Sequence, residues 1–112
     1  MTEPTEAVLI LSTVSSQEEG EKIGTALIER KEAACVNLVP GLTSIYRWEG
    51  KLCRAGEVLL LIKTLRHRIP DVIRTIRELH SYQVPEVIAV PVVDGLPAYL
   101  KWVEDEAGGP EG

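Results

Sequence analysis

The sequence predicts a single α+β domain in which helices cover one face of an antiparallel sheet. The chain has 112 residues, 45% of them hydrophobic and 26% charged, enough for one domain with a modest core. Apolar runs typical of strands are interleaved with two amphipathic patterns, in the order strand, helix, strand, strand, helix, strand. No phenylalanine occurs, so the core is expected to consist of Val, Ile, Leu and Ala.

The first strand is predicted at residues 7–14, an apolar run with little alternation that is typical of a central strand. A helix should follow, because Ser16 and Glu19 have the spacing of a capping box. Its apolar stripe lies within residues 23–27, and charged residues 29–31 close it.

A long hairpin is predicted next. Residues 34–39 have the composition of a strand, Pro40-Gly41 should form a bend or a bulge, and residues 42–48 resume the strand. Residues 49–51 form a tight turn, and residues 52–63 return. At roughly ten residues per arm, this hairpin exceeds the usual strand length. It should project beyond the core and need a partner to cover it.

The second half of the chain repeats the alternation. Pro70 fits only the first turn of a helix, so a second helix should begin near residues 66–69. A fourth strand is predicted at residues 86–93, at an edge because Pro91 cannot donate to a ladder, and a terminal helix at residues 97–106. The apolar stripe of the second helix consists of Ile69, Val72, Ile73, Ile76 and Leu79.

The resulting order is the split βαβ, or ferredoxin-like, pattern. We expect one domain at residues 7–106, a flexible N-terminus at 1–6 and a disordered tail at 107–112. The formal net charge of −5 argues against nucleic acid as a partner bound through bulk charge. A wholly apolar run such as residues 58–62 is far too short for a membrane span.

The polar and acidic N-terminus has no features of a targeting peptide, and we expect a cytoplasmic protein. Cys35 and Cys53 fit reduced thiols, with a disulfide between them left open if their strands pair. Cys35 opens its strand in an apolar context typical of a buried, inert thiol.

The two histidines have both structural and functional interpretations. His67 lies four residues before Asp71, which is typical of a surface ion pair. His80 lies at the end of the second helix, where the helix dipole favours its charged form; the alternative is a ligand or metal contact with Tyr82 and Glu86 nearby.

Other polar and aromatic positions leave further alternatives open. Lys63 could cap a helix or reach an anion, while Tyr46 and Trp48 share a strand face and suit either ligand stacking or an intersubunit contact. No Ser-His-Asp order or paired-carboxylate motif stands out, so we expect a protein that is not an enzyme.

Several segments together resemble the CutA divalent-cation tolerance family, over about residues 7–104. The longest runs from Ala33 to Lys51 and reads AACVNLVPGLTSIYRWEGK. It is followed by Glu57 with Leu59, Leu61, Lys63 and Thr64, then by Leu79-His80-Ser81-Tyr82, Val84-Pro85-Glu86-Val87 and Tyr99-Leu100-Lys101-Trp102-Val103.

This resemblance implies a homotrimer with an architecture similar to that of PII signalling proteins, and divalent metal ions as partners. Copper(II) binding is known in the family, so Cu(II) or another divalent cation is a candidate ligand. We expect no obligatory cofactor. His80 and Tyr82 match the family's His-Pro-Tyr motif, with Ser81 in place of Pro, which would loosen the backbone there. Some members of the family have a copper site with three ligands, a Cys and two His. Ser12 and Leu79 stand at the positions of the Cys and of the second His, so only His80 of these three ligands is present within one chain.

Two functional hypotheses follow. In the first, a trimeric divalent-cation tolerance protein binds metal through His80, with Glu86 or Cys35 as further ligands. In the second, a PII-like signalling module binds a small molecule or an anion in clefts between subunits, through Tyr46, Trp48, Lys63 and Tyr82.

Overall fold

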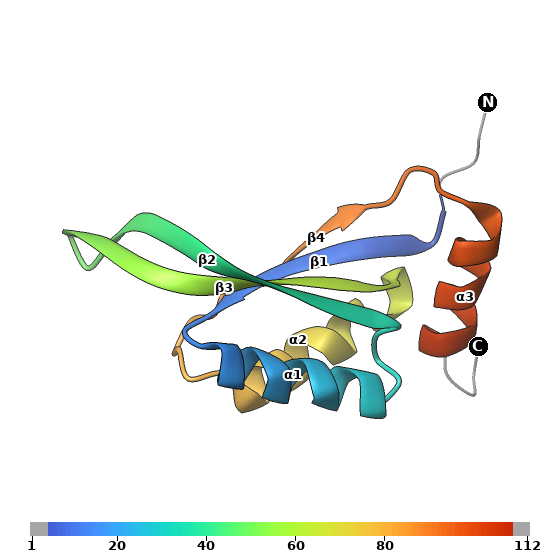
Figure 1. Cartoon of the computed structure of the whole chain (residues 1–112), viewed down its shortest axis with the longest axis horizontal. Helices are drawn as coiled ribbons and strands as arrows, with labels where there is room; N and C mark the ends of the chain where they lie inside the picture. The colour runs from blue at the N-terminus through green and yellow to red at the C-terminus, as the bar shows by residue number, and fades with distance from the viewer. Residues whose placement is uncertain (1–4, 109–112) are drawn as a thin grey trace.

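A computed structural model, which describes residues 5–108, has one four-stranded antiparallel sheet in the order β2-β3-β1-β4. Helices α1 and α2 cover one face of this sheet, and α3 packs against its end (Figure 1). This architecture confirms the predicted α+β class and element order. The elements are β1 (Ala7–Val14), α1 (Gln17–Glu29), β2 (Cys35–Trp48), β3 (Lys51–Leu65), a 3₁₀ turn (Arg66–Arg68), α2 (Ile69–Leu79), β4 (Ile88–Pro91) and α3 (Pro97–Ala107).

The core lies between the sheet and the two helices. Alternate side chains of β1 and of the inner half of β3 point toward the helices and are buried, whereas Leu9, Leu11, Leu59 and Leu61 on the other face are half-buried. The core is aliphatic, as the lack of phenylalanine predicts, and contains Val8, Ile10, Val14, Ile23, Leu27, Val58, Leu60, Ile62, Val72 and Ile76.

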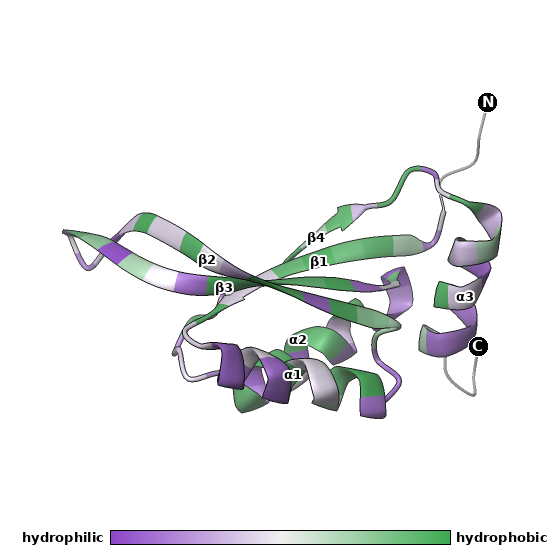
Figure 2. Ribbon diagram, in the orientation of Figure 1, coloured by the Kyte–Doolittle hydropathy of each residue, from purple (hydrophilic) through white to green (hydrophobic). Residues whose placement is uncertain are grey.

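The other face of the sheet carries no helix. The pairing of β1 with β3 and β4 places Leu9, Leu11, Leu59, Leu61, Ile88 and Val90 on it, and we call these six residues the open face. Ile88 and Val90 are 53% and 40% exposed. Figure 2 shows hydrophobic residues along β1 and β4 where no helix covers the sheet.

The α1 cap matches the prediction with one difference. Ser16 Oγ accepts a hydrogen bond from the Glu19 amide, as in a capping box. The Glu19 carboxylate, however, accepts from the amide and hydroxyl of Ser15 rather than from Ser16.

The hairpin of β2 and β3 is longer than predicted, with arms of 14 and 15 residues, and extends well beyond the helices (Figure 1). Its tip is a two-residue turn in which Glu49 and Gly50 both have positive φ, at 51° and 79°. A register shift between Val39 and Leu42 confirms the predicted bulge at Pro40-Gly41, where Gly41 has φ +84°.

Strand β4 is an edge strand, as Pro91 predicts, but it is shorter than the predicted span of residues 86–93. The register that pairs Leu11 with Ile88 would place Glu86 opposite Thr13. The Thr13 carbonyl is already bonded to the His80 ring at 2.7 Å, so the ladder cannot continue in that direction. At the other end, the Val92 amide still donates to the Ala7 carbonyl at 3.1 Å, one residue beyond Pro91.

The ends of the described chain are ordered by specific contacts. Thr5 Oγ1 donates to the Val92 carbonyl, and the Glu6 carbonyl accepts from the Arg66 amide. Thr5 and Glu6 were expected in a flexible N-terminus. Helix α3 runs one residue further than predicted, because Ala107 is fully buried in a cluster with Ala34, Leu65 and Val103. The remaining terminal predictions, for residues 1–4 and 109–112, lie outside the described residues. Within residues 5–108, no helix has the length and apolar character needed to cross a membrane.

Candidate functional site

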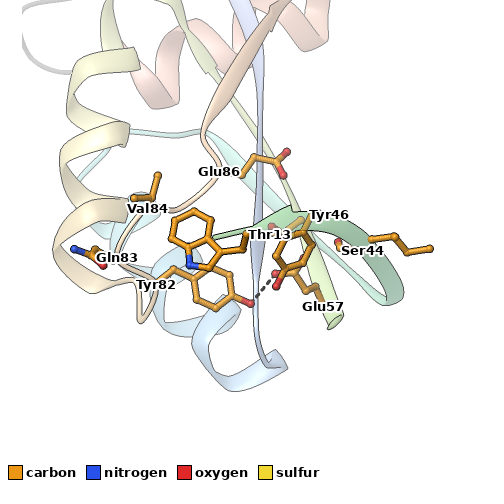
Figure 3. Close-up of a pocket in the computed structure, with 10 residues that line it drawn as sticks. Thr13, Ser44, Tyr46, Glu57, Tyr82, Gln83, Val84 and Glu86 are labelled. Carbon is orange, nitrogen blue, oxygen red and sulfur yellow. Dashed lines mark hydrogen bonds between the residues drawn. The ribbon is translucent and has the colours of Figure 1, made fainter. Parts of the chain in front are cut away.

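A cavity of about 600 Å³ lies at one end of the sheet, between the outer half of the hairpin and the loop that joins α2 to β4 (Figure 3). It brings together four residues that the sequence singled out for chemistry: Tyr46, Trp48, Tyr82 and Glu86. Its other lining residues are Thr13, Ser44, Ile45, Glu57, Gln83 and Val84.

The bulge in β2 decides which side chains of the hairpin reach this cavity. Before the bulge, Val39 pairs with Leu59 on the open side of the sheet. After it, Leu42 pairs with Glu57, so two residues of β2 oppose Val58 alone. Since side chains alternate along a strand, the extra residue moves Tyr46 and Trp48 to the same side as Glu57.

Tyr82 and Glu57 form the polar floor of the cavity. The Tyr82 hydroxyl donates to Glu57 Oε2 at 2.7 Å, which Figure 3 shows as a dashed line. Glu57 is only 8% exposed although it carries a carboxylate. Burial, and next the hydrogen bond to this carboxylate, raise the pKa of Tyr82 well above its usual value. The phenol therefore remains a hydrogen-bond donor throughout the physiological pH range.

His80 lies behind the cavity wall with a fully buried side chain. Its Nε2 lies 2.7 Å from the Thr13 carbonyl, and its Nδ1 accepts a hydrogen bond from the Tyr82 amide at 3.0 Å. A carbonyl can only accept, so this arrangement assigns the proton to Nε2. Both ring nitrogens are thus engaged, and the imidazole connects β1 to the segment that carries Tyr82.

Glu19 fixes the same segment from the other side. Its Oε2 accepts from the Ser81 amide at 2.6 Å and lies 3.6 Å from His80 Nδ1. Partial burial opposes ionisation of Glu19, but hydrogen bonds from Ser81 and Ser15 outweigh it and lower the pKa of the carboxyl. Ser81 was expected to loosen the backbone that presents His80. Instead, it supplies an N–H group that a proline could not.

Cys35 and Lys63 lie away from the cavity. They pair with each other across β2 and β3, in register with Leu9 of β1. Thr13, which contacts His80, lies four residues from Leu9 along β1, a distance of about 13 Å. Cys35 is on β2, two strands from β1, which adds a lateral distance of about 10 Å. Lys63 instead donates to the side chain of Asn37. Within one protomer, the structure therefore does not bring Cys35 close to His80.

Other predicted pairings also differ in the structure. The carboxylate of Asp71 accepts from Arg68 and Arg74 rather than from His67. Cys35 and Cys53 are free thiols, because Cys53 pairs with Tyr46 near the hairpin tip, ten residues from Lys63. Within residues 5–108, no three His, Cys, Asp or Glu side chains are grouped as a metal site.

Glu57 is a site residue that was not expected from the sequence, although it belongs to the segments that resemble the family. Its signal is a single carboxylate directly before the apolar run at residues 58–62. A charged residue in such a position is buried only when a partner is available. Its partner, Tyr82, is 25 residues away and could not be inferred from local spacing.

Residues 8–106 of the chain match the family model described as CutA1 divalent ion tolerance protein. The chain is 46% identical over 100 residues to the divalent-cation tolerance protein CutA of Thermus thermophilus, covering 89% of this chain and 97% of that protein. A solved Thermus structure has a TM-score of 0.89 at 45% identity, covering 91% and 99% of the two chains.

Two other relatives differ in length or stated compartment. The chain is 39% identical over 99 residues to the chloroplastic CutA of Arabidopsis thaliana, covering 88% of this chain but only 54% of that protein. The solved CutA of Archaeoglobus fulgidus, described as periplasmic, is 36% identical with a TM-score of 0.88 and covers 90% and 98% of the two chains.

Proposed function

This chain belongs to the CutA1 divalent ion tolerance family, and we propose that it acts as a homotrimer in the response to divalent metal ions. The observation that carries this proposal is the family match, which extends over residues 8–106 and so includes both the cavity and the open face. We further propose that the protein works by binding and not by catalysis, and that it does so in the cytoplasm.

The uncovered apolar surface supports the trimer. The open face leaves half-buried leucines at its centre and exposed Ile88 and Val90 at its edge. Leu52 and Ile45 on the projecting hairpin are 75% and 61% exposed. Apolar surface of this extent is typical of protein–protein interfaces. Light scattering at low micromolar concentration should give three times the 12.3 kDa chain mass; a particle of one chain mass would contradict the proposal.

For the metal, we propose that His80, Cys35 and Glu86 are ligands contributed by more than one protomer. Imidazole and thiolate are preferred by copper, and Glu86 is accessible at the cavity. Since Cys35 is at the far end of the sheet, it can join the other two only from a second protomer. Coordination of His80 would also require one of its two hydrogen bonds to break.

Titration with Cu(II) tests this ligand set. We expect Cys35→Ser and Glu86→Gln each to weaken binding, and His80→Gln to remove nitrogen hyperfine lines from the electron paramagnetic resonance spectrum of bound copper. Cys53→Ser, at a free thiol near the hairpin tip, is the matched control and should bind like the wild type. Equal affinity and identical spectra for all four variants would exclude these ligands.

The cavity favours a second candidate function, the binding of a small molecule as in a PII-like signalling module. Its volume of about 600 Å³ and its aromatic and polar lining are typical of small-molecule sites. A ligand that binds the folded state raises the melting temperature. A thermal-shift panel of nucleotides, carboxylates and amines should therefore contain at least one stabilising compound, and a panel without any would argue against this candidate.

A further inference from the structure

We infer that the cavity binds an organic cation, an amine or ammonium compound with an apolar body. The inference rests on the proposed small-molecule function and adds the charge class of the ligand. Three features of the site support it: the sign of its charge, its aromatic walls and a carboxylate oxygen that has no hydrogen-bond partner within residues 5–108.

The charge of the lining is negative. Among the described residues that line the cavity, the only charged side chains are the carboxylates of Glu57 and Glu86, and none is Lys, Arg or His. Lys63, the cation expected there from the sequence, bonds to Asn37 elsewhere on the sheet. An anion entering this site would meet only like charges, whereas a cation would be attracted by both carboxylates.

The aromatic walls favour a cation over a neutral molecule. Tyr46, Trp48 and Tyr82 all line the cavity and are 43%, 47% and 36% exposed as whole residues. Figure 3 shows the Tyr82 ring beside the Glu57 carboxylate, to which its hydroxyl is bonded. The negative faces of aromatic rings attract ammonium groups, most strongly where water is partly excluded.

Glu57 provides the specific contact. Its Oε2 accepts from Tyr82, whereas Oε1 has no hydrogen-bond partner within residues 5–108. Oε1 retains some solvent exposure, and Glu57 lines the cavity. Because Glu57 as a whole is only 8% exposed, little water competes for this oxygen, and an ammonium group in the cavity would donate to it in a charge-assisted hydrogen bond.

A charge series on one skeleton tests the inference by calorimetry with the full-length protein in the presence of EDTA, which removes metal ions. The probes are 2-phenylethylammonium, neutral 2-phenylethanol and anionic phenylacetate. We expect the ammonium compound to bind at least about tenfold more tightly than the alcohol, the carboxylate not to bind, and added salt to weaken the ammonium compound selectively.

Variants then locate the site. Glu57→Gln keeps an oxygen that can accept from Tyr82 but removes the charge, and should reduce the preference for ammonium over alcohol about tenfold. Glu49→Gln, in the hairpin turn, is the matched charge control and should leave the preference unchanged. Trp48→Ala should weaken binding of the ammonium compound, whereas Trp102→Ala, in α3, should not.

Each outcome decides the question. Equal binding of the ammonium compound and the alcohol would overturn the charge inference while leaving a small-molecule site. Binding of none of the three would overturn the inference of an organic cation, and the thermal-shift panel would then decide whether the cavity binds any small molecule. Selective ammonium binding that Glu57→Gln does not alter would overturn this cavity as the site.

Discussion

The amide of Ser81 links two segments that are far apart in the sequence. It donates to Glu19 at the start of α1, and the neighbouring residues His80 and Tyr82 contact β1 and β3. The cavity wall is therefore held by hydrogen bonds to three separate elements. A proline in the middle of this segment would remove one of these bonds without changing any side-chain contact of its neighbours.

Ser81→Pro should therefore reduce the free energy of unfolding near neutral pH by about 1 kcal/mol, as the lost charge-assisted hydrogen bond exceeds the gain from a stiffer unfolded chain. The φ of −80° and ψ of 144° at His80 are already suitable before a proline. Ser81→Ala keeps the amide and is the control. Urea denaturation of the wild type and both variants measures the difference.

The effect of Ser81→Pro should depend on pH. The folded state lowers the pKa of Glu19, so this carboxylate contributes stability above its unfolded-state pKa and loses it as the pH falls through the folded-state pKa. The wild type and Ser81→Pro should therefore converge in stability as the solution is acidified. A difference that stays constant down to strongly acidic pH would show that Glu19 is not the partner that matters.

Ser12 is a buried residue whose hydroxyl has no hydrogen-bond partner within residues 5–108. Burial of an unsatisfied hydroxyl costs free energy, so Ser12→Ala should raise the free energy of unfolding by about 1 kcal/mol. Thr64→Val is the opposite case, since Thr64 Oγ1 donates to the Glu32 carbonyl, and it should lower stability by a similar amount. Thermal denaturation of both variants would refute this account if both were destabilised equally.

One extra residue in β2 changes which side chains of the hairpin face the cavity. The bulge at Pro40-Gly41 turns the outer half of β2 over, so that Tyr46 and Trp48 face the cavity. The sequence predicted the bulge from the proline–glycine pair, and alternation predicted that the two aromatic residues share a face. Which of the two faces they occupy depends on the register against β3, which local spacing does not contain.

Gly41→Ala tests the bulge. A Cβ at this position meets nothing within 4 Å, so the only cost is the positive φ of +84°. We expect a loss of about 1 kcal/mol in the free energy of unfolding. Gly56→Ala, at a strand position that is equally uncrowded and has no positive φ, is the matched control and should be neutral or slightly stabilising. Chemical denaturation that showed equal stability for both variants would mean that the bulge tolerates a different backbone.

For the molecule as a whole, the sequence was sufficient to predict the order of the elements, the aliphatic core and the edge position of β4. Two of the seven candidate site residues, Cys35 and Lys63, could not be placed correctly with respect to the other five. Cys35 and Lys63 lie at one end of the sheet and Tyr82 at the other, although all are near strand ends in the sequence. Only the pairing of strands reveals which ends coincide.

Leu61→Lys tests the proposed assembly at the centre of the open face. Leu61 is half-buried and pairs with Leu11 and Asn37. A lysine can keep its ammonium group in water in a single chain, but it would bury a charge in an interface between copies. We expect the particle mass to fall toward 12.3 kDa by light scattering, with an unchanged circular dichroism spectrum. Ile28→Lys, on the exposed side of α1, should retain the mass of the wild type.

The position of the five aromatic residues has a spectroscopic consequence. All five, Tyr46, Trp48, Tyr82, Tyr99 and Trp102, are at least 36% exposed, and the buried core contains none. Intrinsic fluorescence will therefore report on the cavity and on α3, and it will be nearly blind to the packing of β1 against α1 and α2. In a Trp102→Phe variant, Trp48 becomes the single tryptophan and emits from the cavity wall alone. The protein thus carries its own reporter for whatever enters that cavity, with no dye attached.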